Sequence, residues 1–408
     1  MRARWSAAAL AMLLCSNWPA RAAAPEQVEA LYLDAMRLLN EDRQEEANAV
    51  FEQLIALEPH HAGAWLELAI NHCALGHPAE AERLFRDIEV RFAPSAGILD
   101  IINSHRRRGC QPWQARSQRA FTMTAGSDSN VNQGASNPVF VTGSGAERIE
   151  SYLTDDFLPK RDSYLQSTLD WTRELSQRGT VAFAQLRVRR HRSVTEQDTN
   201  ALLLGLDRPF RLGHWSGHTM ASTSLISLDG KLYQRQLQLQ ARLLPPLKLQ
   251  RDTELALSAA LGRVVYVSRR NFDADTGELA AQLNYRTSAN QAQAAAGALL
   301  EHGGGARLGG DRHGWYASVQ WQHQFSERTG AELGWSRQDW LASTVFAPGL
   351  IDVVRDQSTR QWRAALVRAL APQHSVVLEL RQIHNRENIT LFQYNSQVLQ
   401  LSWRWTGF

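Results

Sequence analysis

The sequence predicts a multidomain α + β chain, with a short N-terminal α-helical repeat unit followed by a 14-stranded antiparallel transmembrane β-barrel. Hydrophobic residues recur with the period of a helix up to about residue 110, and with the two-residue period of a strand from about residue 119 onward. The charge divides at the same place. Residues 26–105 carry 15 acidic and 5 basic side chains, whereas residues 106–408 carry 36 basic and 26 acidic ones.

Length and composition exclude several classes of protein. The chain has 408 residues, of which 44% are hydrophobic and 21% charged, so it is not a disordered chain. Its 26 glycines and 13 prolines are too few for a collagen-like protein, and three cysteines cannot support a disulfide scaffold. No stretch approaches the roughly 18 apolar residues of a membrane-spanning helix.

Residues 1–22 are predicted to be an export signal. Arg2 and Arg4 precede a short apolar run, and Ala20-Arg21-Ala22 fits the small-x-small pattern of a cleavage site. The mature chain is therefore expected in an oxidising compartment, where Cys73 and Cys110 are the two remaining thiols. The sequence leaves open whether these cysteines form a disulfide or stay unpaired.

Residues 25–110 repeat with a spacing of 34 residues, so that Leu31 corresponds to Trp65 and Phe51 to Phe85. Small residues recur at the same spacing, as Ala35, Ala47, Ala69 and Ala81. This pattern resembles the tetratricopeptide repeat (TPR), a helix–turn–helix unit that usually docks other proteins. Residues 96–109 are predicted to form a capping helix. We expect this domain to bind a client protein; a spacer without a ligand is the alternative.

Residues 119–408 alternate between apolar and polar side chains, as expected for a barrel between lipid and an aqueous lumen. In residues 315–324, for example, Trp315, Ala317, Val319 and Trp321 lie opposite Tyr316, Ser318, Gln320 and Gln322. A soluble β-sandwich would rarely sustain this pattern over so many strands. Fourteen strands are predicted, centred near residues 123, 168, 185, 202, 222, 237, 259, 281, 296, 320, 333, 363, 379 and 400.

The connections between these strands indicate the orientation of the barrel. Those after odd strands are mostly long, at 128–162, 191–198, 268–277, 301–313 and 338–357. Those after even strands are mostly short, with exceptions at 208–216 and 243–252. Since short turns face the periplasm, the N-terminal domain is expected there. The terminal Phe408 resembles the signal that outer-membrane barrels present to the barrel assembly machinery, although its parity differs from that of the outward face.

Two sets of polar residues are candidates for function. By parity, the lumen candidates are Arg187, Arg189, Arg242, Arg286, Arg363, Arg381 and Arg404, which would favour an anionic or acceptor-rich passenger. The candidates for client binding or gating are Asp128, Ser129, Asn130 and Asn132, in a turn after the first strand. Ordinary lumen solvation and a strand-ending turn are the simpler alternatives. We predict no metal site, no cofactor, no catalytic residue and no nucleic-acid partner, because none of the corresponding motifs is present.

Two segments resemble a known family. The run Asp128-Ser129-Asn130-Val131-Asn132 after the first strand, and more loosely Asn388–Tyr394, together with the TPR-plus-barrel plan, resemble the surface lipoprotein assembly modulator (Slam) family. The resemblance implies an outer-membrane translocator that takes a lipoprotein or secreted protein from the periplasm to the cell surface. The alternative is a TPR-barrel porin for exopolysaccharide secretion. A third class is a structural or adhesive barrel whose outer loops bind partners.

Overall fold

The computed structural model describes residues 25–41, 43–110, 114–143, 148–176, 179–212, 215–247, 249 and 252–407. The chain divides into two compact units, with the boundary between Gln114 and Ala115. The predicted export signal at residues 1–22 and the terminal Phe408 lie outside the described residues. No helix within the described ranges is long and apolar enough to cross a membrane.

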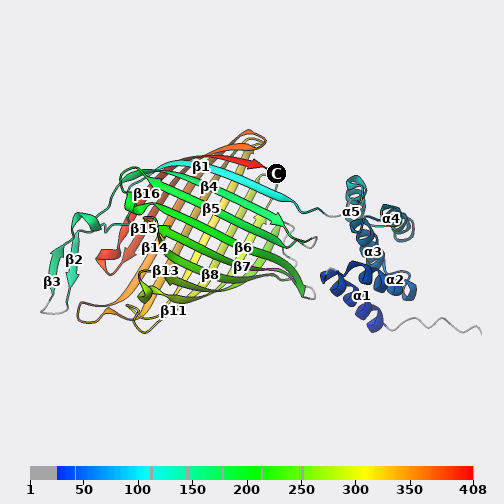
Figure 1. Ribbon diagram of the computed structural model, residues 1–408, viewed down its shortest axis with the longest axis horizontal. Helices are drawn as coiled ribbons and strands as arrows, with labels where there is room; N and C mark the ends of the chain where they lie inside the picture. The colour runs from blue at the N-terminus through cyan, green and yellow to red at the C-terminus, as the bar shows by residue number, and fades with distance from the viewer. Residues whose placement is uncertain are drawn as a thin grey trace, which may run out of the picture. The chain divides into compact units, whose positions relative to one another are not determined.

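The first unit is helical (Figure 1). Its helices are α1 (Pro25–Asn40), α2 (Gln44–Leu57), α3 (Ala62–Ala74), α4 (Pro78–Phe92) and α5 (Ala96–Arg108). Helices α1 and α2 pack against each other, as do α3 and α4, which gives two helix–turn–helix pairs followed by a fifth helix. Pro78 opens α4 in the first turn, where a missing backbone N–H costs nothing because that group has no partner within the helix.

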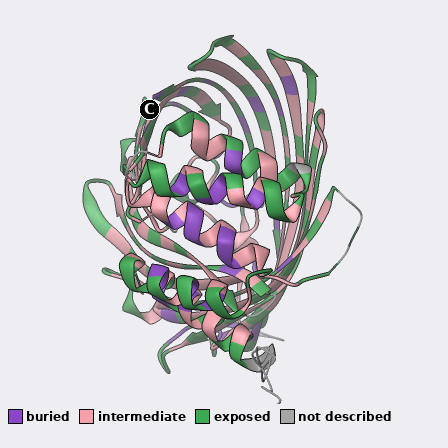
Figure 2. Ribbon diagram, turned by 90° about the vertical axis from the view of Figure 1, so that its right-hand side faces the viewer, coloured by how far each residue is buried: buried purple, intermediate pink, exposed green. Residues whose placement is uncertain are grey.

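The core of the helical unit is built from the repeated positions. The fully buried residues include Ala35, Ala47, Ala69, Ala81, Phe51 and Phe85. Figure 2 shows the buried residues as stripes along the helices. The alanines let the helices approach closely, and the aromatic rings fill the space between layers. Trp65 is also buried, and its indole Nε1 donates a hydrogen bond to the carbonyl oxygen of Pro59 at 3.1 Å.

Two links fasten the fifth helix to the repeats. A disulfide joins Cys73 at the end of α3 to Cys110, which follows α5. Arg106 on α5 donates hydrogen bonds to Glu82 at 2.9 Å and to Glu89 at 2.7 Å, both on α4. The hydrogen bond from Arg106 is the main reason that the pKa of Glu82 lies below its usual value. An array of two repeats is shorter than the three usually needed for stability, so these links replace part of the missing packing.

The second unit is a closed antiparallel barrel of 14 strands, which confirms the predicted fold class. Its strands are β1 (Ser117–Asp128), β4 (Asp162–Glu174), β5 (Val181–His191), β6 (Thr199–Leu212), β7 (Trp215–Leu228), β8 (Lys231–Leu244), β9 (Thr253–Tyr266), β10 (Ala274–Arg286), β11 (Asn290–Gly303), β12 (Arg312–Ser326), β13 (Thr329–Ala347), β14 (Ile351–Ala371), β15 (His374–Glu387) and β16 (Tyr394–Gly407). Each strand pairs with its neighbours in order, and β1 closes the barrel against β16. Every predicted strand centre falls within one of these strands.

The strand register separates an outward face from a lumen face. Residues directly opposite each other share a face, and Leu401 lies opposite Ala125 on one side and Leu378 on the other. The outward rows are dominated by Leu, Ala, Val and Trp, and many of these side chains are strongly exposed, such as Leu261 (68%) and Leu279 (67%). Exposed leucines in rows around a closed barrel form a surface for lipid. The lumen rows carry Gln, Arg, Ser, Thr and Glu.

The connections differ at the two ends of the barrel. At the end where β1 starts, they span 175–180, 213–214, 245–252, 287–289, 327–328 and 372–373, and at the other end 129–161, 192–198, 229–230, 267–273, 304–311, 348–350 and 388–393. Two predicted connections are wrong. Residues 208–216 belong mostly to β6 and β7, and most of 338–357 belongs to β13 and β14, which continue as strands with register shifts beyond Leu341.

The first long connection, which was predicted to be a loop, contains a hairpin. Strands β2 (Val139–Thr142) and β3 (Ile149–Tyr152) form a separate two-stranded sheet. Figure 1 shows this hairpin projecting beyond the end of the barrel. Phe140 on β2 packs against a small apolar cluster that includes Phe346 and Ile389. The hairpin is therefore held by the neighbouring outer connections.

Candidate functional site: the barrel lumen and its outer rim

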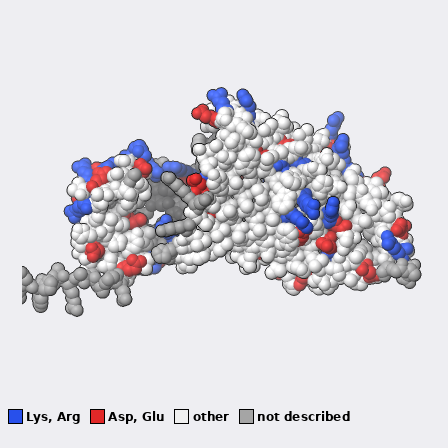
Figure 3. All heavy atoms as spheres, turned by 180° about the vertical axis from the view of Figure 1, so that it is seen from behind, with Lys and Arg blue, Asp and Glu red and all other residues white. Residues whose placement is uncertain are grey.

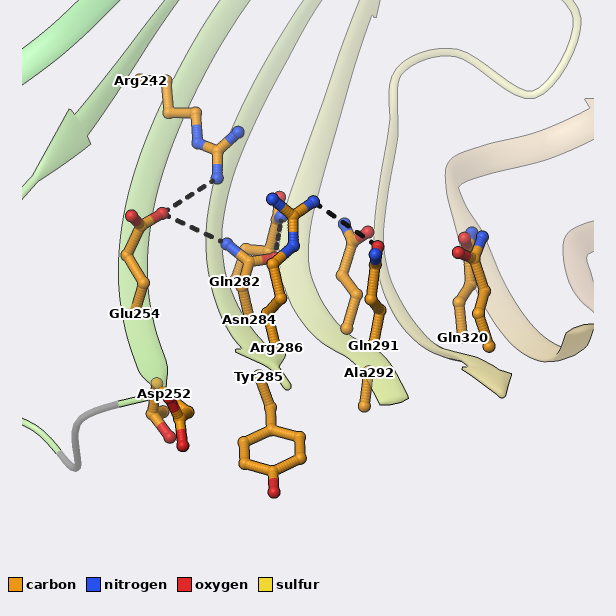
Figure 4. A pocket seen from close by; sticks show the side chains of 13 residues that line it. Arg242, Asp252, Glu254, Gln282, Asn284, Tyr285, Arg286, Gln291, Ala292 and Gln320 are labelled. Atoms are coloured by element: carbon orange, nitrogen blue, oxygen red, sulfur yellow. Dashed lines mark hydrogen bonds and ion pairs between the residues drawn. The ribbon is translucent and has the colours of Figure 1, made fainter. Parts of the chain in front are cut away.

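A hollow of about 710 Å³ lies along the lumen wall formed by neighbouring strands β8 to β12 (Figure 4). Amide side chains line most of it, and we name them the carboxamide wall: Gln282, Asn284, Gln291, Gln293, Gln320 and Gln322. The two-residue strand period places them on one face, and the register sets Gln293 opposite both Asn284 and Gln320. Arg242, Glu254 and Arg286 complete the polar lining.

Only some of the amide groups in the carboxamide wall form hydrogen bonds with other protein residues. Gln282 Nε2 donates to Asn284 Oδ1 at 2.6 Å, and Arg286 reaches Gln291 Oε1 at 3.5 Å. Within the described chain, the side chains of Gln293, Gln320 and Gln322 form no hydrogen bond to another residue. An amide offers both donors and an acceptor, so this wall can bind peptide groups, hydroxyl groups or water.

Basic side chains border the same hollow. Arg242 lies 3.7 Å from Glu254, which is the length of a loose ion pair, and Figure 4 shows both beside Asn284. Arg286 forms no ion pair in the described chain. Both arginines therefore keep hydrogen-bond donors available to a passenger, in contrast to the arginines on the nearby strands β14 and β15.

The lumen face of β13 to β15 is closed by ion pairs. Arg363 donates to Glu332 at 2.6 Å and to Glu379 at 2.7 Å, and Arg381 donates to Glu379 at 2.5 Å. The carboxylate side chain of Glu379 is only 6% exposed. The predicted lumen residues Arg363 and Arg381 lie on the lumen face, but neighbouring carboxylates neutralise most of their charge.

The remaining lumen candidates lie near the strands that close the barrel. The Arg189 guanidinium stacks over the Tyr164 ring at 4.2 Å, and its Nε donates to Gln166 at 3.0 Å. Arg187 contacts only an amide oxygen at 3.3 Å, and Arg404 is exposed on the lumen face of β16. The structure thus separates a basic and amide-rich lumen region from an ion-paired one.

Tyr164 forms a contact between strands at the closure of the barrel, and this contact was not predicted from the sequence. Its ring covers Gly126 on β1, where a Cβ atom would lie 2.5 Å from the ring carbon Cζ. Its hydroxyl donates to Gln400 on β16 at 2.7 Å, so one side chain spans three strands at the closure of the barrel. The signal in the sequence is a glycine within a strand, which often marks close approach of another group.

The four turn candidates are engaged in local hydrogen bonds. Asp128 Oδ1 accepts from Asn130 N at 2.8 Å and from Ser396 Oγ at 2.7 Å, and Ser129 Oγ accepts from a β16 backbone N–H at 2.8 Å. Asn130 is buried. Its Oδ1 accepts a hydrogen bond from Gly134 N at 2.8 Å, and its Nδ2 donates one to Gly134 O at 2.9 Å.

Asn132 extends this network to the returning half of the first outer connection. Its Oδ1 accepts from Lys160 N and its Nδ2 donates to Leu158 O, both at 2.9 Å. Lys160 in turn lies within 3.4 Å of carboxylates on Asp156 and Glu196, and hydrogen bonds to them raise its pKa. The four candidate side chains therefore shape the first outer connection.

The outer rim also contains a buried ion pair that the sequence did not reveal. Arg355 donates two hydrogen bonds to Glu387, at 2.6 and 2.7 Å, and the Glu387 side chain is 1% exposed. The guanidinium also lies 4.5 Å from the Phe392 ring. This arrangement joins the outer ends of β14 and β15 to the connection before β16. No spacing in the sequence brings these three residues together.

Known proteins are similar to parts of this chain. A tetratricopeptide-repeat family model matches residues 38–93. No curated protein matches the chain. Among solved structures, the outer membrane protein OmpT of Vibrio cholerae has a TM-score of 0.40 and 7% identity, covering 72% of this chain and 100% of that one. The anion-selective porin of Comamonas acidovorans has a TM-score of 0.39 and 9% identity, covering 72% and 99%.

The fold defines the class of this protein. A closed antiparallel barrel with an apolar outward face and a polar interior is the architecture of an outer-membrane β-barrel. The repeat match adds a TPR domain at residues 38–93. The chain is therefore an outer-membrane β-barrel that carries a TPR domain.

Proposed function

We propose that this chain is an outer-membrane translocator that captures a client protein in the periplasm and exports or displays it at the cell surface. One observation carries the proposal: a single chain joins a protein-docking repeat to a lumen whose amide wall has few partners of its own. The resemblance of Asp128–Asn132 to the Slam family supports a lipoprotein or a related secreted protein as the client.

Chain connectivity supports the periplasmic side for the TPR domain. Residues 109–116 connect α5 to the start of β1, at the barrel end that carries the shorter turns. In outer-membrane barrels this end faces the periplasm. The export signal expected at residues 1–22 agrees with delivery to that compartment, and assembly of the barrel then requires the barrel assembly machinery and outer-membrane lipid.

The chemistry of the two units fits an extended polypeptide. Residues 26–105 carry 15 acidic and 5 basic side chains, which favours a basic segment in the client. The carboxamide wall can pair with the donors and acceptors of a peptide backbone without demanding a particular sequence. The lumen arginines that border it, Arg242 and Arg286, add donors for acidic side chains, and Arg187 adds another donor on the lumen face of β5. In this proposal Asp128, Ser129, Asn130 and Asn132 position the first outer connection beside the exit.

The experiment is crosslinking in living cells, combined with a deletion strain. A photocrosslinking amino acid is placed at Leu33 or Val90, which are 57% and 85% exposed on the helical unit. We expect one secreted protein or lipoprotein to be captured, and the same protein to lose protease accessibility at the surface of cells that lack the gene. Normal surface display of every captured protein in the deletion strain would refute the proposal. A variant lacking residues 25–110 should retain the barrel but fail to restore display.

An exopolysaccharide is the second candidate passenger, because amides and arginines also bind hydroxyl and carboxylate groups of sugars. The hollow bordered by Arg242 and Arg286 would then bind an anionic polymer. Loss of secreted polysaccharide, with unchanged surface proteins, in the deletion strain would establish this alternative. We propose neither an enzymatic activity nor a cofactor.

A further inference from the structure

Two arginines form a cationic row on the outward face of the barrel. Arg337 on β13 lies directly opposite Arg360 on β14, which lies opposite His384 on β15. They share this face with Trp335 and Trp362, the next outward pair on β13 and β14. Like charges directly opposite each other on a sheet destabilise it, so this pairing calls for an anion.

The partners on the protein do not neutralise the cationic row. Asp339 pairs with Arg337 through Nε at 2.9 Å and through Nη2 at 3.3 Å, which leaves Arg337 Nη1 without a partner in the described chain. Arg360 is exposed, and the described residues provide it with no ion pair or hydrogen bond. The one carboxylate in this region of the described chain that pairs with the cationic row contacts Arg337 and not Arg360.

Tryptophan side chains indicate the depth of the cationic row in the membrane. The rings of Trp335 and Trp362 lie 6.3 Å apart on the membrane side of the two arginines, and the Arg337 guanidinium lies 5.3 Å from the Trp315 ring. Tryptophans gather where lipid headgroups meet the apolar layer. Figure 3 shows a broad area of uncharged atoms on the barrel wall, with basic and acidic side chains on either side of it.

An apolar groove continues from the cationic row. It has a volume of about 590 Å³, and its outward lining residues are Leu257, Leu279, Ala281, Ala296, Ala298 and Trp315. The register joins the two features, because Ala281, Ala296, Ala317 and Arg337 occupy consecutive opposed positions from β10 to β13. The small alanine side chains leave a hollow that an acyl chain can fill.

We propose that the outward face of β10 to β14 binds a phosphorylated glycolipid of the outer leaflet. A phosphate group lies between Arg337 and Arg360, where it relieves their repulsion, and an acyl chain occupies the groove beside Trp315. This site uses the barrel orientation argued above but not the export role, so either proposal can fail without the other.

The test is native mass spectrometry of the full-length protein in detergent, titrated with lipid A that carries two phosphates. The variant Arg337→Gln/Arg360→Gln removes both guanidinium groups. At about 1 kcal/mol for each arginine, we expect roughly 30-fold weaker binding. The matched control is Arg190→Gln/Arg235→Gln, which removes two outward arginines from β5 and β8 and should change binding less than about twofold.

Two further arms identify the ligand chemistry. Dephosphorylated lipid A and phosphatidylglycerol should bind the wild type more weakly than diphosphorylated lipid A, and inorganic phosphate alone should not displace the lipid. Ala296→Phe should weaken binding by filling the groove while leaving both arginines in place. Heat-modifiable migration on a gel verifies that each variant forms a barrel. Equal lipid binding by the two arginine double variants, or undiminished binding of dephosphorylated lipid A to the wild type, would overturn the proposal.

Discussion

Removal of the Cys73–Cys110 disulfide is predicted to loosen the helical unit while leaving the barrel folded. The bond joins residues with a sequence separation of 37, and closing a loop of that length lowers the entropy of the unfolded chain by an amount equivalent to about 4 kcal/mol. An array of two repeats has little stability in reserve. With a denaturant slope of about 1.5 kcal/mol/M, Cys73→Ala/Cys110→Ala should lower the urea midpoint of this unit by roughly 2–3 M.

Pulse proteolysis in urea measures this change on the full-length protein. The helical unit should be cleaved at lower urea concentration in the variant, while the barrel fragment persists in both proteins. Reductant should give the wild type the midpoint of the variant and should leave the variant unchanged. An unaltered urea midpoint in the variant would show that the disulfide does not stabilise this unit, because packing alone would then hold the two repeats and α5 together.

Three further predictions concern single positions. Arg106 lowers the pKa of Glu82, so the contact between α4 and α5 should contribute its full stability above the ordinary carboxyl pKa of about 4.3. This stability should be lost as the pH falls through the lower pKa that Glu82 has in the folded state. Amide hydrogen exchange in α5 should therefore become faster on acidification, and Arg106→Gln should remove most of this pH dependence. Gly126→Val should destabilise the barrel by about 1–3 kcal/mol, because the new side chain would displace the tyrosine ring packed over that glycine. Gly334→Val should cost less, because its Cβ would lie 3.6 Å from the Arg363 side chain, and heat-modifiable migration on a gel compares the two variants. Asn130→Ala removes three hydrogen bonds and should speed protease cleavage of the first outer connection on intact cells without shifting barrel melting; unchanged cleavage would contradict its positioning role.

The strands could be predicted from the sequence because the different environments on the two faces of the barrel wall make apolar and polar residues alternate. The alternation of Trp315, Ala317 and Val319 with polar residues follows directly from lipid on one face and water on the other. The outer parts of β13 and β14 were missed for the same reason. Beyond the apolar belt both faces meet water, so residues such as Asp339 and Asp356 have the composition of a loop while the backbone remains paired.

Contacts between distant segments could not be predicted. The parity of Arg363 and Arg381 assigns a face, but their pairing with Glu379 depends on the register of β14 and β15. The hairpin of β2 and β3 has only four residues in each strand, too few to give a clear period. Helical spacing likewise suggested the position of α5 but not that Cys73 lies beside Cys110.

In the proposed function, a client protein passes through the lumen beside the carboxamide wall. The most direct measurement places a photocrosslinking amino acid at Gln293, on the lumen face of β11, and in a matched variant at Ala294, the adjacent outward residue. During secretion, we expect position 293 to capture the client found with the helical unit, and position 294 to capture lipid or no protein. Equal capture of that client from both positions, or from neither while its export continues, would contradict passage through the lumen.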